Sequence, residues 1–267
     1  MNLTHIFNEG IKPAETLLCL YEELVTSNER AIRPEWENRF LATKLTSWPK
    51  TTNLWRSYSK DKNILIVGTC SSRLTHKSFE QDTMTLFLHS AIVAAVAAVD
   101  KILHEALSLH FVKLAKTGKL DTLAQLPPSK VYEIATRART RKGKGGKTKS
   151  RSGDSIKEGV IEQIYKDTYL DSRHIEKICD SFGQTNVFYK SGQTFPEKFT
   201  AKQMKTKWGR IYHIRNIIAH ECGMERKLRT KKITYISLTH KQASDAIAFC
   251  KKFGSFLATA LQSGPSS

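Results

Sequence analysis

One short segment carries residue types suited to proton transfer at a phosphate. The segment Trp208–His220, WGRIYHIRNIIAH, holds Arg215, Asn216 and His220 close together. On a helix, Asn216 and His220 lie one turn apart, and Arg215 projects from the flank of the same face. Histidine titrates nearest to neutral pH, and arginine stays charged and can hold two phosphate oxygens. We therefore expect His220 to transfer protons and Arg215 to hold the phosphate. Asn216 would orient His220 or hydrogen-bond the phosphate.

The residues around this motif indicate how a helix would hold it. Ile214, Ile217 and Ile218 can fix the backbone against a core, and Gly223 can end the helix just after His220. The histidine would then lie in the last turn, near solvent. Spacing alone is a weak signal, because a histidine at a helix C-terminus can simply interact with the helix dipole. The context of the motif must decide between these interpretations.

The charge of the chain favours a polyanionic partner. The 267 residues include 43 Lys and Arg against 25 Asp and Glu, for a formal net charge of +18. Such a surplus indicates nucleic acid ahead of an anionic membrane. The alternative is a solvated cationic surface with no bound polyanion.

Cysteine usage and the start of the chain favour the cytoplasm. The five cysteines are scattered and form no C-x-x-C pair, which fits free thiols better than disulfides or a zinc site. The opening MNLTHIFNEG lacks the basic and apolar regions of a signal peptide. We expect a cytoplasmic protein without a metal or other cofactor.

A basic tract interrupts the chain between residues 137 and 151. Its sequence, RARTRKGKGGKTKSR, has no acidic residue and no large apolar residue, so it cannot build a core. Its charges can neutralise phosphates with little base specificity, although a solvated insertion is the alternative. The predicted RNA-binding residues are Arg137, Arg139, Arg141, Lys142, Lys144, Lys147, Lys149 and Arg151.

Hydrophobic periodicity predicts a mainly α protein. The segment 186–199, NVFYKSGQTFPEKF, is expected to be a polar, aromatic loop, and Thr239 is expected to cap the last helix. Helices are predicted at 11–31, with an apolar stripe after Pro13, and at 81–116, 129–138, 156–168, 172–182, 201–222 and 240–262. A strand is predicted at 233–238, and a short buried strand or a loop packed on the core at 63–68.

The predicted helix 81–116 is apolar nearly all round in its first half, so we expect it at the centre of a bundle. Its longest apolar stretch, Leu86–Val99, is too short to span a bilayer. Asp100 and His104 share one face of the helix and are candidate supporting residues for the site. Asp100 could pair with Arg215, or it could make a structural contact inside the bundle.

The predicted fold is therefore a helical bundle with a basic loop insertion and minor β structure. We expect two parts. Residues 1–75 form an N-terminal helical extension that packs on the bundle, and residues 76–267 form the helical domain with the insertion at about 137–155.

The motif resembles that of the HEPN superfamily, in which an arginine, a polar residue, three further residues and a histidine lie late in a helical bundle. Arg215, Asn216 and His220 fill these positions. The segment Ala98–Glu105 is similar to the central acidic helix of the RiboL-PSP-HEPN group. The resemblance covers roughly residues 80–120 and 200–262.

This resemblance implies a metal-independent RNA endoribonuclease, acting as a toxin or an antiviral-defence effector. Cleavage by 2′-OH attack would leave a 2′,3′-cyclic phosphate or 3′-phosphate and a 5′-OH end. It also implies a homodimer whose composite active site holds both copies of Arg215 and His220. Expected partners are RNA, with tRNA among the candidates, and an antitoxin or sensor protein, but no membrane. Cys222 stands where toxins paired with nucleotidyltransferases carry a tyrosine, so control through that tyrosine is not supported.

Two other classes of function compete with the enzyme. A non-catalytic HEPN module could bind RNA or a nucleotide within a larger complex, but it would not need a histidine at position 220. A DNA-binding regulator would need a helix-turn-helix, and none is found in the sequence. His213 lies on another face of the predicted helix and is interpreted as a bystander.

Overall fold

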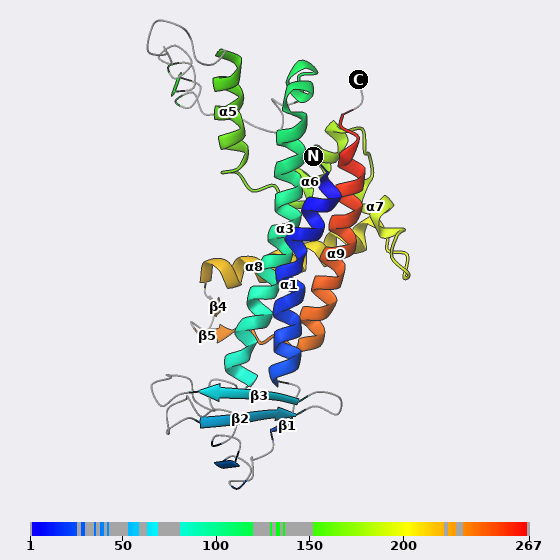
Figure 1. The fold of residues 1–267 in the computed structure, drawn as a ribbon. Coiled ribbons are helices and arrows are strands. Elements are labelled where there is room, and N and C mark those ends of the chain that lie inside the picture. Colours follow the sequence, from blue (N-terminus) through cyan, green and yellow to red (C-terminus); the bar gives the residue numbers. More distant parts are fainter. Residues whose placement is uncertain are drawn as a thin grey trace, which may run out of the picture. The chain divides into compact units, whose positions relative to one another are not determined.

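Helices make up most of what the structure describes, which confirms the mainly α prediction. The computed structural model describes residues 2–25, 28–29, 53–58, 63–68, 81–119, 152–221, 224–227 and 232–265, with a few single residues between these ranges. Side chains are described mainly for residues 2–24, 84–119, 157–220 and 236–265. The helices in this part (Figure 1) are α1 Leu3–Val25, α3 Gln81–Lys116, α5 Ser152–Ile164, α6 Ser172–Ser181, α7 Val187–Gly192, α8 Ala201–Glu221 and α9 His240–Gln262.

Short antiparallel strands supply the predicted minor β structure. Strand β2, Asn53–Tyr58, pairs with β1, Asn28–Glu29, and with β3, Asn63–Gly68. Strand β3 has the bounds that its apolar run predicts. Strand β4, Met224–Lys227, pairs with β5, Lys232–Tyr235. The sequence predicts β5 but not β4, because MERK is short and charged and shows no alternation of apolar residues.

Among the described residues of 1–75, α1 is followed by β1–β3, and the single residues 35, 38, 39 and 42 are helical. The domain boundary at residue 75 stays a prediction. The basic tract at 137–151 lies outside the described residues, as does most of the helix predicted at 129–138.

The chain forms two compact units, which are described separately. The first comprises residues 1–11, 95–214 and 249–267, and the second comprises residues 12–94 and 215–248. Helices α1, α3, α8 and α9 contribute residues to both units.

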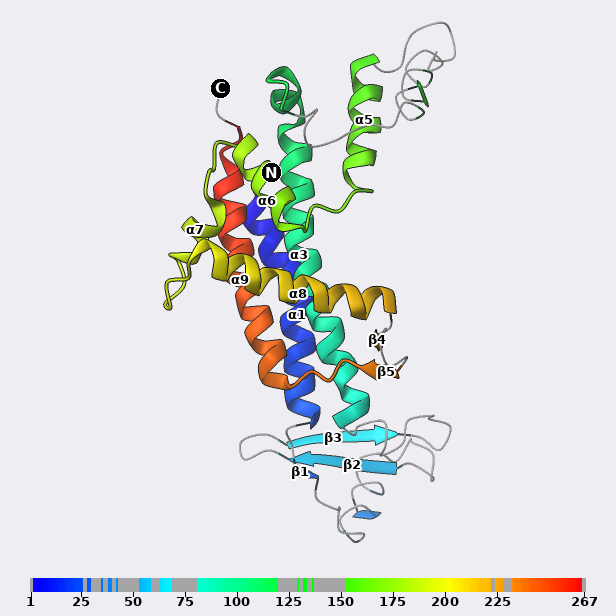
Figure 2. The same ribbon diagram turned by 180° about the vertical axis from the view of Figure 1, so that it is seen from behind.

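In the first unit, α1 packs closely against α3 and α9 (Figures 1 and 2). A Cβ atom at Gly10 would lie 3.5 Å from the Cβ atom of Ala98, so the α1 and α3 backbones approach closely there. The backbone N–H of Leu3 donates to Oε1 of Gln262 over 2.6 Å, which ties the start of α1 to the end of α9. Gly254 gives the buried ring of Phe7 its space on α9.

Helix α3 is the most deeply buried of these helices in its middle turns, as its composition predicts. Val99, Ile102, Leu103, Ala106 and Leu107 are all fully buried. The observed helix is longer than the apolar stretch Leu86–Val99, and its part Met84–Lys116 is by length and composition long and apolar enough to cross a bilayer. Half of the most apolar stretch of this helix is buried inside the protein. The core helix of a soluble protein can be equally long and apolar.

In the second unit, α1 and α9 meet through a histidine. Nε2 of His240 lies 2.7 Å from Oε1 of Glu22, and the His240 ring stacks parallel to the ring of Tyr21 at 5.8 Å. His89 on α3 hydrogen-bonds through Nε2 to the carbonyl oxygen of Ile236 over 3.2 Å. Burial lowers the pKa of His89, so its neutral form is favoured.

Capping boxes start the two helices that follow loops in the C-terminal part. At α9, Oγ1 of Thr239 accepts from the backbone N–H of Gln242, and Oε1 of Gln242 accepts from the N–H of Thr239. Thr200 and Gln203 make the same pair of bonds at the start of α8. These bonds satisfy backbone N–H groups that a helix start leaves unpaired, and they confirm Thr239 as a cap.

Three predicted elements are wrong in detail. Helix α5 spans Ser152–Ile164, where 156–168 is predicted. Helix α1 spans Leu3–Val25, where 11–31 is predicted, and Pro13 lies inside it. The buried side chains of Leu3, Phe7 and Ile11 stabilise the turns before the proline and outweigh its missing N–H. The expected loop at 186–199 contains α7, where burial of Val187 and Phe188 stabilises a helix too short for its periodicity to be visible.

The Gly254 contact predicts a destabilising substitution. Gly254→Ala would place a Cβ atom inside the ring of Phe7, and overpacking of this kind typically costs about 1–3 kcal/mol. Gly209→Ala is the matched control, because among the described residues no atom outside the neighbouring backbone of α8 lies within 4 Å of its Cβ position. Alanine there should stabilise the helix by up to about 1 kcal/mol. Urea unfolding of both variants checks the prediction, and equal stability of the two would contradict it.

Candidate active site

The C-terminal end of α8 carries the Arg-Asn-x-x-x-His motif. Upstream, α8 is fixed by Trp208, which is fully buried and donates through Nε1 to the carbonyl oxygen of Leu170 over 2.7 Å. Ile217 is buried within the motif itself. His220 lies in the last turn, and its side chain is exposed, as expected.

Arg215 and Asn216 are joined directly. Nη1 of Arg215 donates to Oδ1 of Asn216 over 3.0 Å, and both side chains are half-buried. Nε of Arg215 is buried and has no hydrogen-bond partner in the described part of the chain. The bond to Asn216 therefore holds one edge of the guanidinium group. The carbonyl oxygen of Asn216 accepts this bond from Arg215, and the role of Asn216 in orienting His220 or binding phosphate stays a prediction.

This arrangement separates two chemical tasks along one helix end. A half-buried guanidinium held by a neighbour is suited to binding two oxygens of a phosphate in a defined orientation. An exposed imidazole is accessible to a substrate that binds from solution, and it can exchange a proton with that substrate. The described geometry thus fits a phosphate bound at Arg215 with proton transfer at His220.

Asp100 and His104 lie on α3 in the first unit and contact one another only loosely. Nδ1 of His104 is 4.0 Å from Oδ1 of Asp100, whereas Nε2 of His104 is 2.8 Å from the carbonyl oxygen of Asp167. A carbonyl oxygen can only accept, so Nε2 carries a hydrogen and donates it. His104 is 7% exposed and connects α3 to the chain after α5. Arg215 belongs to the second unit, so its pairing with Asp100 stays a prediction.

His104 is surrounded by a cluster of polar side chains. The sequence did not predict this cluster. The hydroxyl of Tyr165 donates to Oε1 of Glu105 over 2.7 Å, and Lys101 pairs with the same carboxylate over 2.6 Å. Burial, together with the Glu105 carboxylate, raises the pKa of Tyr165 to about 12. Burial also raises the pKa of Tyr169, with smaller contributions from Asp167 and Asp100.

The only sequence signal for this cluster was a set of polar residues on an otherwise apolar helix. Its partners on residues 165–169 are about 60 positions away, so spacing along the helix could not reveal them.

The cations of the predicted RNA-binding tract, Arg137 to Arg151, lie outside the described residues, as does Cys222. Among the described residues, no group of three His, Cys, Asp or Glu side chains could hold a metal ion.

The fold and the site together define a mainly α protein with an Arg-Asn-x-x-x-His motif at the end of a long helix. The family model described as RiboL-PSP-HEPN matches residues 68–263, which is more than half of the chain, and the chain belongs to this family. No curated protein and no solved structure matches the chain. Family membership indicates a nuclease or RNA-related module. It is compatible with ribonuclease activity, although HEPN domains can also be non-catalytic.

The buried bond of His104 predicts a structural role that can be measured. His104→Leu should lower the free energy of unfolding by about 1–3 kcal/mol, because the part-buried carbonyl of Asp167 loses the hydrogen bond that His104 donates. His104→Gln should lose less, because its amide can still donate. His213→Leu, at an exposed position on α8, is the control. Urea unfolding gives the comparison, and a His104→Leu variant as stable as the control would refute the role.

Proposed function

We propose that the protein is a metal-independent RNA endoribonuclease. The observation that carries the proposal is the end of α8, where Arg215 is held by Asn216 and the imidazole of His220 is exposed in the last turn. Membership of the RiboL-PSP-HEPN family and the net charge of +18 support RNA as the substrate.

The reaction needs only groups of this kind. The ribose 2′-oxygen attacks the adjacent phosphorus while a histidine takes the 2′-OH proton. The bond between phosphorus and the 5′-oxygen breaks, and that oxygen receives a proton as it leaves. The products are a 2′,3′-cyclic phosphate, which water can open to a 3′-phosphate, and a 5′-OH end. The Arg215 guanidinium stabilises the charge that develops on the non-bridging oxygens.

One imidazole cannot easily take the 2′-OH proton and also protonate the leaving 5′-oxygen on the opposite side of the phosphorus. We therefore propose a homodimer in which two copies of Arg215 and His220 meet in a composite site, one histidine acting as base and the other as acid. In the cytoplasm such an enzyme would serve as a toxin or an antiviral-defence effector. Its activity would be restrained by an antitoxin or a sensor partner.

Cleavage in EDTA tests the proposal directly. The wild type should cut total RNA or purified tRNA in excess EDTA and leave 5′-OH ends. His220→Ala should lower the rate by about 10²–10⁴-fold through the lost proton transfer. Arg215→Ala should lower it by about 10²–10³-fold through the lost charge stabilisation. End mapping and initial rates give both results.

His213→Ala is the matched control, because it removes an exposed histidine from the same helix and should leave the rate unchanged. Circular dichroism shows whether each variant is folded. Activity that survives both Arg215→Ala and His220→Ala would overturn the assignment. Tight RNA binding without any cleavage would favour the non-catalytic RNA-binding module.

Asn216 should act through Arg215. Removing its acceptor oxygen by Asn216→Ala frees the guanidinium and should lower kcat by about tenfold. Asn216→Asp keeps an acceptor and should retain more activity. In an Arg215→Ala background, Asn216→Ala should cause no further loss, which a double-mutant cycle measures. A full additional loss, or a shifted pH–rate profile, would instead indicate that Asn216 orients His220.

A further inference from the structure

Two lysines stand over phenylalanine rings at the surface of the first unit. Nζ of Lys207 on α8 lies 4.6 Å from the centre of the Phe199 ring, and Nζ of Lys252 on α9 lies 5.2 Å from that of Phe195. The two rings are themselves 5.4 Å apart. A cation over an aromatic face is attracted to it, so each ammonium group is held near its ring. We call these four residues the lysine–phenylalanine surface.

One ring of this surface, that of Phe195, is anchored in the core, and the half-buried ring of Phe199 contacts it. Phe195 is 6% exposed and stacks on Phe249 at 5.3 Å, and Phe249 contacts the fully buried Phe253. Because the rings cannot move freely, the ammonium groups above them are confined as well. The cation–π contacts favour these positions of the ammonium groups before any ligand binds, which reduces the entropy lost on binding.

The loop that carries the two phenylalanines is held by its own backbone. The N–H of Phe199 donates to the carbonyl of Gly192 over 3.2 Å, and Nε2 of Gln193 donates to the carbonyl of Phe199 over 3.3 Å. A Cβ atom at position 192 would collide with the carbonyl oxygen of Phe199, so this close approach requires glycine. Lys198 donates to the carbonyl of Gln193 over 2.7 Å in the same loop.

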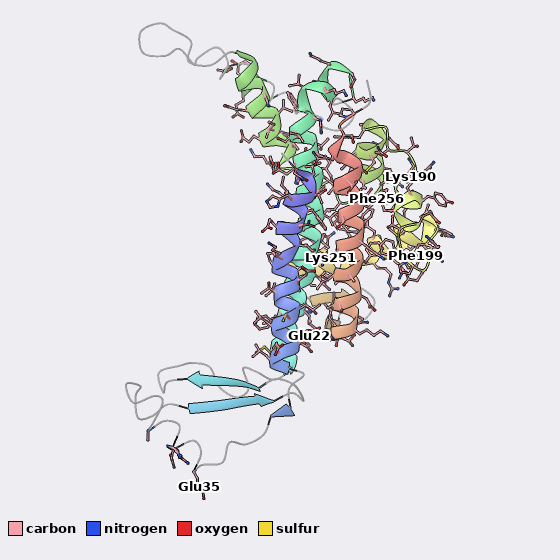
Figure 3. The ribbon with its side chains drawn as sticks, turned by 45° about the vertical axis from the view of Figure 1, so that its right-hand side comes forward. Glu22, Glu35, Lys190, Phe199, Lys251 and Phe256 are labelled. Atoms are coloured by element: carbon pink, nitrogen blue, oxygen red, sulfur yellow. The ribbon has the colours of Figure 1, made fainter. Side chains whose placement is uncertain are left out.

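The charge of this region is unbalanced. Residues 187–210 contain six Lys or Arg and one acid, Glu197, and residues 249–262 contain two Lys and no acid. Lys205 is already paired with Glu176 over 2.7 Å. In contrast, neither Lys207 nor Lys252 forms an ion pair with any residue that the structure describes. Figure 3 shows Lys190 and Phe199 on the segment beside α9, and Lys251 on α9 itself.

We infer that the lysine–phenylalanine surface binds the phosphate backbone of the RNA substrate, an inference that rests on the proposed function. Confined, unneutralised ammonium groups suit phosphate oxygens. Phe195 is buried, and the ammonium group of Lys207 lies over one face of the half-buried Phe199 ring, so little open ring area is left for stacking bases. Binding at this surface is therefore independent of base sequence. It adds a contact on folded helices to the one predicted for the tract at 137–151.

Salt-dependent RNA binding tests this inference. The full chain carrying His220→Ala, which cannot cleave, is titrated with a fluorescent single-stranded RNA of mixed sequence in EDTA. Fluorescence anisotropy is measured from 50 to 300 mM KCl. Adding Lys207→Gln and Lys252→Gln should weaken binding about tenfold or more at the lowest salt. Losing two phosphate contacts should also make the slope of log K against log salt less steep by about 1.4.

Two controls separate a binding role from a structural one. Lys116→Gln with Lys177→Gln removes the same charge from exposed positions on α3 and α6, and should leave the slope unchanged. Lys207→Arg with Lys252→Arg keeps a cation over each ring and should restore both affinity and slope. Thermal unfolding of all variants shows whether the loss of a cation–π contact has altered the fold.

The outcomes distinguish this inference from the function on which it rests. If the Lys→Gln pair binds RNA with the slope of the control pair, the surface does not contact phosphate, and the cleavage proposal is unaffected. If the His220→Ala parent binds no RNA at any salt concentration, both the inference and the proposed function fail. If the arginine pair does not restore binding in a folded protein, charge is not the property that matters, and the inference is wrong.

Discussion

The buried indole of Trp208 joins three parts of the first unit, and the position of α8 depends on it. The ring lies 5.4 Å from Phe253 on α9, and its N–H donates to the carbonyl of Leu170 over 2.7 Å. A fully buried indole N–H without a partner would be costly, so this bond selects one rotation of α8 about its own axis. The same helix carries Lys207 before the tryptophan and the Arg-Asn-x-x-x-His motif after it. The position of Lys207 in the first unit therefore depends on this buried contact.

A second constraint is the polar chemistry inside α3. A helix with so much buried apolar surface tolerates His104 and Glu105 only because donors and acceptors meet them. These partners come from the chain just after α5, through the carbonyl of Asp167 and the hydroxyl of Tyr165. The cluster thus connects α3 to this segment more specifically than apolar contacts alone would. These bonds give His104 and Glu105 a structural role, and the supporting role of His104 at the active site stays a prediction.

Prediction from sequence succeeded where a local pattern was long and strong. Helices α3 and α9 have the predicted bounds, because their apolar positions repeat over many turns and a capping Thr239 precedes α9. It failed where packing between distant segments overrides the local signal. Helix α7 has only six residues and is stabilised by the contact of Phe188 with Phe253. Helix α1 continues through Pro13 because the turns before it are buried.

The sequence by itself determined the mainly α fold, the excess of positive charge and the placement of His220 in the last turn of a helix, because each depends on composition or on neighbours within a few residues. Only the tertiary structure decided that His104 bonds to Asp167 and that Lys207 and Lys252 stand over phenylalanine rings. Even the bond between the adjacent residues Arg215 and Asn216 depends on side-chain rotamers that the sequence does not reveal. Such contacts join side chains through space, and their geometry is set by which helix faces are buried together.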